Sequence, residues 1–285
     1  MYSGLDLQLN PRCPPGCIVN VEVMPVRMAV LGLVFLVLGG GFAMGQVSSS
    51  ASSFASSDEP VRVSIGTFVF EQGERLALEL TREEPCPCMC DEITVTGFRV
   101  LNGEGAVVYR VQDGFPLPAG EWVGRWDLVD AAGNPVPPGS YTALVETSLG
   151  EFQVELLVVA AGERPSGRSL AQASVCGLGL RVYRLLTEED DRAIVELQEG
   201  ELFMVALPGN PTTGYQWAPE VEPGFLDRVA GVDYLPSTAL IGGGGTFYFR
   251  YRAQAPGAGE LSLVYRRPWE SVPPEKIFSI TVIVR

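Results

Sequence analysis

Short runs of β-branched and aromatic residues recur along the chain from Val61 onwards, and Gly, Pro, Asn and Asp separate them. Runs at this spacing, with turn residues between them, are typical of β-sandwiches. No segment has a convincing helical period, so we expect the regular elements to be strands. The expected strands span 76–80, 93–101, 106–111, 122–128, 141–146 and 152–159 in the first half, and 178–184, 194–197, 202–207, 246–253, 259–266 and 277–284 in the second.

Breaks in this pattern divide the chain into two domains joined by linkers. Residues 46–60 are rich in Ser and Ala, and residues 161–174 carry Gly, Pro and Ser without periodicity, which is typical of flexible connectors. Residues 61–160 and 175–285 each have the strand pattern of a sandwich. We therefore predict an all-β protein with two immunoglobulin-like β-sandwich domains in tandem.

Alternation within single strands predicts which side chains face the core. It is clearest at residues 247–252, which read FYFRYR, so Phe247, Phe249 and Tyr251 share one face. In the first domain, residues 126–143 read WDLVDAAGNPVPPGSYTA. A turn around Asp130 and Asn134 separates two strands there, which predicts a β-hairpin.

The segment 126–143 resembles the immunoglobulin-like module of flagellar hook-capping proteins and of the intracellular proteinase inhibitors of bacilli. The matching residues are Trp126, Asp127, Gly133, Pro138, Gly139 and Tyr141. The resemblance concerns the fold, so no function is carried over from it.

The N-terminal segment has the three parts of a secretory signal. Arg27 precedes the apolar run 29–38, and Ala43 and Gly45 are the small residues before a cut at Gln46. We therefore expect residues 1–45 to be a signal peptide region, with the true start at Met24 or Met28. The mature protein is then secreted or periplasmic. The apolar run is short for a membrane span, so a membrane is a partner only if the signal stays uncleaved.

Composition excludes several kinds of function. The 285 residues include no histidine and carry a formal net charge of -14. Without histidine there is no Ser-His-Asp or Cys-His catalysis and no His-ligated metal site. The sequence contains no basic patch, so we do not expect a nucleic-acid partner. We expect a protein that is not an enzyme, without catalytic residues, metal, cofactor or small-molecule substrate.

The first of three unusual loops in the second domain is NPTTG at residues 210–214. Pro211 fixes its own φ and biases Asn210 towards an extended conformation. Thr212 and Thr213 are β-branched and have little rotamer freedom. Gly214 can take a positive φ. This loop is expected to be ordered before it meets a partner, and it offers no charge, base or metal ligand.

Two further loops follow the first in the chain. Residues 242–245 are four glycines before a strand, and another protein can approach such a bare backbone closely. Residues 267–270 read RPWE, a proline-stiffened turn that holds a large aromatic side chain.

Taken singly, each loop has an ordinary interpretation. NPTTG suits a strand-connecting turn and GGGG a flexible turn. Trp269 suits a core position, because tryptophan is usually well buried. Trp217, with Tyr215 beside it, is expected in the core. The conjunction of the three loops in one short all-β domain favours a joint role.

The motifs NPTTGYQW, GGGG before an aromatic strand, and RPWE occur in the order found in one family. Residues 175–285 resemble the chagasin-type inhibitors of papain-like cysteine peptidases over the whole second domain. The resemblance implies three loops side by side at one end of the sandwich, forming a wedge that reversibly occludes the peptidase's active-site cleft. The partner it implies is a papain-like cysteine peptidase.

The same resemblance implies a role for each loop. The first loop lies over the catalytic thiolate, the glycine loop lies along the substrate-binding side, and the third loop reaches the leaving-group side. Inertness suits a loop that faces a nucleophile. The implied peptidase-binding residues are Asn210, Pro211, Thr212, Thr213, Gly214, Tyr215, Gly242, Gly243, Gly245, Arg267, Pro268 and Trp269.

Two points stay open at the level of sequence. Cys86, Cys88, Cys90 and Cys176 suit disulfides or plain thiols in an exported protein, although three converging sulfurs also suit a soft metal such as Cu(I). The alternative function is a non-inhibitory envelope module that binds a surface protein or glycan. The target peptidase, the role of the first domain and the oligomeric state do not follow from the sequence.

Overall fold

The computed structural model describes residues 20–23, 61–82, 94–111, 115–116, 121–148, 150–163, 171–175, 178–231, 233–237 and 242–285. Within these ranges every element is a strand except two single 3-10 turns, η2 (Glu188–Asp190) and η3 (Pro211–Thr213). The all-β prediction is confirmed. In the same ranges, no helix is long and apolar enough to span a membrane. The four mature-chain cysteines and the proposed cut before Gln46 fall outside the described residues.

The N-terminal sandwich is built on a six-stranded sheet in the order β2-β9-β8-β4-β5, with β6 beside β4. Its strands are β2 (Val61–Glu71), β4 (Thr94–Asn102), β5 (Val107–Val111), β6 (Phe115–Pro116), β8 (Gly139–Thr147) and β9 (Gly150–Val159). Opposite it lie β3 (Arg75–Arg82) and β7 (Glu121–Trp126), which pair with each other. Leu76, Leu78 and Leu80 of β3 point into the core between the sheets and are fully buried.

The C-terminal sandwich has a four-stranded sheet in the order β12-β19-β18-β14. These strands are β12 (Ile194–Leu197), β14 (Gln216–Val221), β18 (Gly257–Arg266) and β19 (Lys276–Val284). Opposite them lie β13 (Leu202–Gly209), β15 (Leu226–Arg228), β16 (Tyr234–Pro236) and β17 (Gly245–Ala253). Phe247 and Tyr251 of β17 are buried in the core, and Phe249 packs against it, as the alternation predicted.

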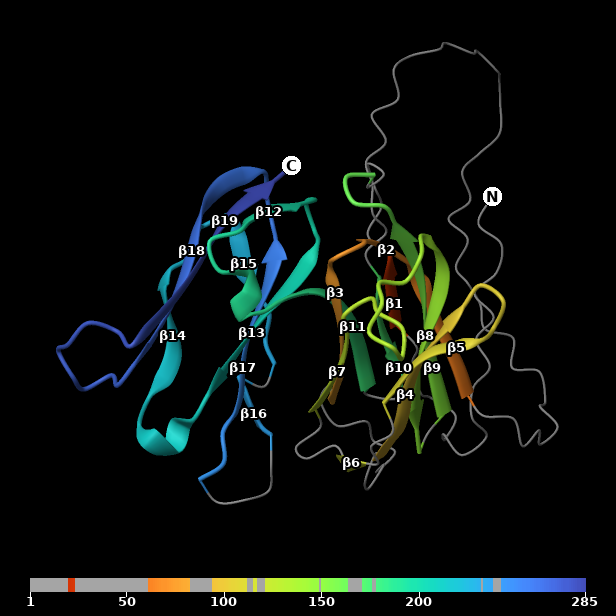
Figure 1. The fold of residues 1–285 in the computed structure, drawn as a ribbon, viewed down its shortest axis with the longest axis horizontal. Coiled ribbons are helices and arrows are strands. Elements are labelled where there is room, and N and C mark those ends of the chain that lie inside the picture. Colours follow the sequence, from red (N-terminus) through yellow and green to blue (C-terminus); the bar gives the residue numbers. More distant parts are fainter. Residues whose placement is uncertain are drawn as a thin grey trace, which may run out of the picture.

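One sheet runs through both sandwiches (Figure 1). Strand β11 (Leu178–Leu186) pairs with β3 over eight residue pairs, from Leu178↔Arg82 to Leu185↔Arg75, and its last residues pair with β13. It also pairs with β10 (Ala171–Val175), which in turn pairs with β1 (Asn20–Val23). Because β10 begins at Ala171, the connection between the sandwiches is shorter than the expected linker 161–174.

Strand β11 belongs to both sandwiches. Leu180 and Val182 lie in the N-terminal core, whereas Leu186 lies in the C-terminal core. The boundary between the two domains therefore runs through a strand, and the two cores share one continuous hydrogen-bonded sheet.

The shared sheet folds sharply between the two sandwiches. Arg125 on β7 and Tyr248 on β17 are four strand positions apart, which corresponds to roughly 19 Å in a flat sheet. Both side chains lie on the face of the sheet that points away from the two cores, yet Arg125 Nη2 donates to the Tyr248 hydroxyl at 2.6 Å. The N-terminal domain is thus folded against the outer face of β13 and β17.

The segment 126–143 forms only the innermost part of the predicted hairpin: Val129 and Pro135 make an isolated antiparallel bridge, but the flanking strands do not pair. Strand β7 pairs with β3, whereas β8 pairs with β4 and β9, so the two strands lie in different sheets. The turn itself is present, because Asp130 accepts from the backbone of Ala132 and Asn134 at 2.9 Å each. Val136 N still donates to Leu128 O at 2.9 Å, but Pro137 and Pro138 lack backbone donors, so the ladder ends there.

Candidate functional site

The three loops predicted from the sequence lie at the same end of the C-terminal sandwich (Figure 1). The first connects β13 to β14, the second connects β16 to β17, and the third connects β18 to β19. The pairings Gly209↔Gly245 and Gln216↔Arg266 bring the bases of these loops together. The strands that flank each loop also contribute side chains to the C-terminal core, and this fixes where the loops begin and end.

The first loop is fixed by its own hydrogen bonds. Asn210 caps the single turn η3, because its side-chain Oδ1 accepts from Thr212 N at 3.1 Å and from Thr212 Oγ1 at 2.7 Å. The Thr213 hydroxyl donates to Asn210 O at 2.6 Å. Gly214 ends the turn with φ +84°, a conformation that favours glycine. Both threonine hydroxyls therefore have acceptors within the loop.

Asn210 also joins the first loop to its surroundings. Its side-chain Nδ2 donates to Gly242 O in the second loop at 2.9 Å, and its backbone N–H donates to the Tyr265 hydroxyl at 2.9 Å. The Tyr265 ring in turn stacks on Tyr215, with 5.4 Å between ring centroids. A single asparagine thus ties two loops and strand β18 together.

The third loop packs on the first. A Cβ at Gly214 would lie 2.6 Å from the Trp269 ring, so the ring rests directly on this glycine. The Arg267 guanidinium lies 4.6 Å from the centroid of the Tyr215 ring, and its Nε donates to Thr213 O at 3.3 Å. Glu270 accepts from Arg267 at 2.8 Å, and this hydrogen bond raises the pKa of the guanidinium. The three loops form one connected structure.

The tip of this structure is exposed and bears little charge. Pro211, Thr212 and Thr213 are exposed, as is Pro268, and Trp269 is 69% exposed. The core interpretation of Trp269 is therefore wrong, whereas Trp217 is buried in the core as expected and donates to Pro208 O at 3.0 Å. The charged groups of the third loop, Arg267 and Glu270, neutralise each other.

The glycine loop differs in detail from its expected role. Gly242 is exposed and has φ +85°, so it can present backbone to a partner. Gly245 is buried, and a Cβ there would lie 2.2 Å from Leu235 O and 2.6 Å from the Tyr234 ring. Because Gly245 has no side chain, Tyr234 and Leu235 of β16 can lie directly against the start of β17. This close approach shapes the base of the second loop.

Sequence reasoning missed two residues of the site. Tyr265 holds Asn210 from beneath, and Glu270 holds Arg267. Glu270 is part of the motif RPWE and carried a signal, but Tyr265 is one aromatic among several in the strands. No group of three or more Cys, Asp or Glu suited to a metal occurs among the described residues.

Comparison with known proteins identifies the family. The family model described as Chagasin family peptidase inhibitor I42 matches residues 196–282. Amoebiasin-1 of Entamoeba histolytica is 32% identical over 100 residues, which are 35% of this chain and 98% of Amoebiasin-1. Chagasin of Trypanosoma cruzi is 33% identical over 89 residues, which are 30% of this chain and 81% of that protein.

Among solved structures, the cysteine protease inhibitor EhICP2 from Entamoeba histolytica aligns with 35% of this chain and 94% of its own, at 25% identity and a TM-score of 0.33. The family matched by sequence is one of peptidase inhibitors, not of enzymes, in agreement with the expectation from composition. Through its C-terminal domain, the chain belongs to the chagasin family of peptidase inhibitors.

Proposed function

We propose that the protein is a reversible inhibitor of papain-like cysteine peptidases and that its three loops fill the active-site cleft. The observation that carries the proposal is the hydrogen-bonded and stacked connection of the loops through Asn210, Gly214 and Arg267. Loops that are ordered before binding lose little conformational entropy when they bind.

The chemistry of the first loop suits a position opposite a nucleophile. Thr212 and Thr213 already donate their hydroxyl protons to Asn210, and among the described residues neither has a neighbouring base that would activate it. Pro211 removes one N–H and stiffens the backbone against the distortion that attack on a carbonyl requires. In the proposal, residues 210–214 cover the catalytic thiolate without presenting a bond for cleavage, so the complex forms and dissociates unchanged.

The other two loops supply contacts on either side. Gly242 and Gly243 approach the peptidase with bare backbone on the substrate-binding side, and Gly245 keeps that backbone in place. Arg267 and Pro268 hold Trp269 as an exposed anchor on the leaving-group side. Tryptophan and arginine are the side chains most often found to dominate binding energy at interfaces. Tyr215 supports the anchor from below through the Arg267 guanidinium.

A titration of papain with the full mature chain tests the proposal. We expect stoichiometric loss of activity, with trypsin unaffected as the control. Binding to papain whose thiol carries a small blocking group should persist, because no covalent bond forms. Full activity of several papain-like peptidases in excess protein would contradict the proposal and favour the envelope module that binds a surface protein or glycan. A stable adduct by mass spectrometry would contradict the occluding mechanism.

We also propose that the protein acts outside the cytoplasm, secreted or in a periplasm. Support comes from Arg27, the apolar run 29–38 and the small residues before Gln46. N-terminal sequencing of the exported protein should begin at Gln46. A mature mass that still includes residues 29–38 would contradict cleavage and indicate an anchored form.

A further inference from the structure

The inhibitory domain has an outer face that the N-terminal domain covers. On β13 and β17 this face carries Leu202, Met204, Ala206 and Tyr248, all buried. They pack in one hydrophobic cluster with Ala77, Tyr183 and Leu185 of the paired strands β3 and β11. Burial of these apolar groups is favourable and is lost if the domains separate.

A buried carboxylate stands at the centre of this contact. Glu79 of β3 has no exposed side-chain surface and accepts from Arg250 Nε of β17 and from the Tyr183 hydroxyl, the latter at 2.7 Å. Arg181 Nη1 lies 3.7 Å from the same carboxylate. Burial, together with the charge of Glu79, raises the pKa of the Tyr183 phenol, so the phenol keeps the proton that it donates.

A second contact with β17 lies nearer to the glycine loop than the contact of Glu79 does. Arg125 of β7 donates to the Tyr248 hydroxyl, and its guanidinium lies 5.2 Å from the centroid of the Tyr248 ring. The Arg250 guanidinium lies 5.6 Å from the same centroid. Tyr248 and Arg250 are the third and fifth residues after Gly245, where β17 leaves the glycine loop.

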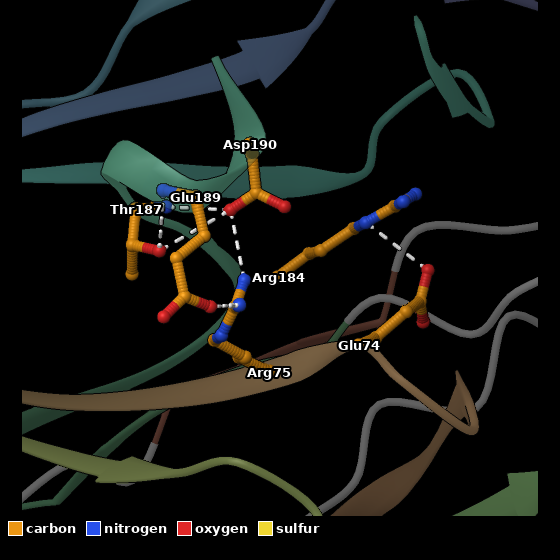
Figure 2. Close-up of polar contacts among 6 residues, drawn as sticks. All are labelled: Glu74, Arg75, Arg184, Thr187, Glu189 and Asp190. Carbon is orange, nitrogen blue, oxygen red and sulfur yellow. Dashed lines mark hydrogen bonds and ion pairs between the residues drawn. The ribbon is translucent and has the colours of Figure 1, made fainter. Parts of the chain in front are cut away.

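Salt bridges add to the junction where β3 and β11 lie beside η2 (Figure 2). Arg75 of β3 reaches Asp190 of η2 at 2.9 Å and also contacts Glu189. Arg184 Nε of β11 lies 3.0 Å from Glu74 Oε1. The junction therefore combines apolar packing, a buried ionic cluster and paired strands.

The covered strands are the ones that lead into two of the three loops. Strand β13 ends at Gly209, directly before Asn210, and β17 begins at Gly245. The third loop is carried by β18 and β19, whose strand partners all lie in the C-terminal sandwich. In Amoebiasin-1 the matched segment is 98% of the protein, so the N-terminal domain of this chain is an addition to what that relative contains.

We propose that the N-terminal domain is a positioning element for the inhibitory loops, in which Arg125 and Glu79 hold β17 and thereby set the first and second loops relative to the third. The inference rests on the proposed inhibition. When the hold is loosened, only a fraction of molecules presents the competent arrangement, and apparent affinity falls by that fraction. The loss then appears in the association rate, whereas loss of a direct contact appears in dissociation.

The test uses the full chain and papain with a blocked thiol, with both rate constants measured. Arg125→Ala should slow association roughly three- to tenfold and leave dissociation nearly unchanged. Arg125→Lys should restore association, because lysine keeps a donor and a cation near Tyr248. Arg110→Ala removes the same charge from an exposed position on β5 and should have no effect. Glu79→Gln, which keeps the side-chain shape, should act in the same direction as Arg125→Ala.

Hydrogen exchange in the free protein separates this inference from the proposed function. Arg125→Ala should speed exchange of the Thr213 and Gly214 amides, which bond within the first loop, and leave the Glu270 amide of the third loop unchanged. If wild-type protein binds no papain-like peptidase, the proposed function fails and exchange alone decides the positioning. Unchanged association and exchange in Arg125→Ala, or an equal loss in Arg110→Ala, would overturn the inference.

Discussion

Arginine packs over tyrosine both at the loops and at the domain junction, and the two places use the pair differently. At the loops, Arg267 lies over Tyr215, and the neighbouring Trp269 stays exposed. At the junction, Arg125 and Arg250 lie on Tyr248, which is buried. The same kind of cation–π contact stiffens the exposed loops in one case and joins the two domains at a buried interface in the other.

The two regions also differ in where charge is placed. The junction buries a carboxylate with arginines around it, whereas the loop tip of residues 210–214 has no ionisable group. Removal of one member of a buried ionic cluster mainly affects folding. Removal of an exposed anchor mainly affects binding. Substitutions at the junction should therefore lower stability and slow association, whereas substitutions of exposed side chains at the loop tip should speed dissociation and leave stability nearly unchanged.

The largest effect is expected at Glu79. Glu79→Ala removes the acceptor of Arg250 and Tyr183 in a fully buried position, so the free energy of unfolding should fall by about 3–5 kcal/mol. Urea unfolding measures it. The control is Glu104→Ala in an exposed turn, which should change stability by less than about 0.5 kcal/mol. Equal stability of the two variants would contradict the buried cluster.

The next effect is expected at Trp269, with the opposite pattern. Trp269→Ala should raise the dissociation rate from a papain-like peptidase by roughly thirtyfold, equivalent to about 2 kcal/mol. Its unfolding temperature should stay close to wild type, because the side chain is 69% exposed. The matched control is Ile194→Ala, which truncates a 67% exposed side chain on β12. If Trp269→Ala unfolds at a much lower temperature and binds normally, the ring has been assigned to the wrong region.

A smaller effect is expected at Gly214, where conformation and contact combine. Gly214→Ala introduces a side chain at φ +84° and pushes the Trp269 ring, so stability should fall by about 1–3 kcal/mol and affinity should fall as well. Gly105→Ala tests the conformational part alone, because its φ is +80° and nothing lies within 4 Å of the added Cβ. Thermal unfolding of both variants is compared, and the difference in lost stability is due to the contact with the Trp269 ring. Equal losses would show that the ring moves aside without cost.

The smallest effect is a difference in alkaline stability. The pKa of Tyr183 is raised in the folded protein, so the unfolded chain loses this proton first, at its ordinary value of about 10. The associated stability is fully present below that pH and is lost as pH rises. Between pH 10 and 11 wild type should lose about 1 kcal/mol more than Tyr183→Phe. Between pH 7 and 8 the difference between them should be constant, and a parallel loss at high pH would contradict the buried phenol.

Much of the secondary structure and of the site could be predicted because the responsible signals are local. Alternation predicted the core face of β17, and β-branched runs predicted β12 over its observed length. The three loops could be predicted because Pro and Gly determine the backbone conformation at their own positions, and Trp provides a large contact surface at its own. Strand β2 (Val61–Glu71) was missed, since Ser64, Gly66 and Thr67 interrupt its apolar run.

The junction could not be predicted, because strand pairing between domains depends on tertiary structure. Nothing in the local pattern of 76–80 or 178–184 indicates that these segments pair. The one available signal was a charge in an apolar strand: Glu79 between leucines, and Arg250 between aromatics. Their ion pair becomes evident only once the structure brings β3 and β17 together at the junction.

The pairing of β3 with β11 also sets an order of assembly. Leu80 and Leu180 are partners although 100 residues separate them, whereas β3 finds β7 much sooner along the chain. During synthesis, one edge of β3 stays open until β11 emerges, and an open strand edge can pair with another chain. Charged side chains on an open strand disfavour such pairing, and Glu79 lies on β3, 171 residues before its partner Arg250. We therefore expect the carboxylate that stabilises the folded junction also to disfavour pairing of β3 with another chain before the C-terminal domain is made.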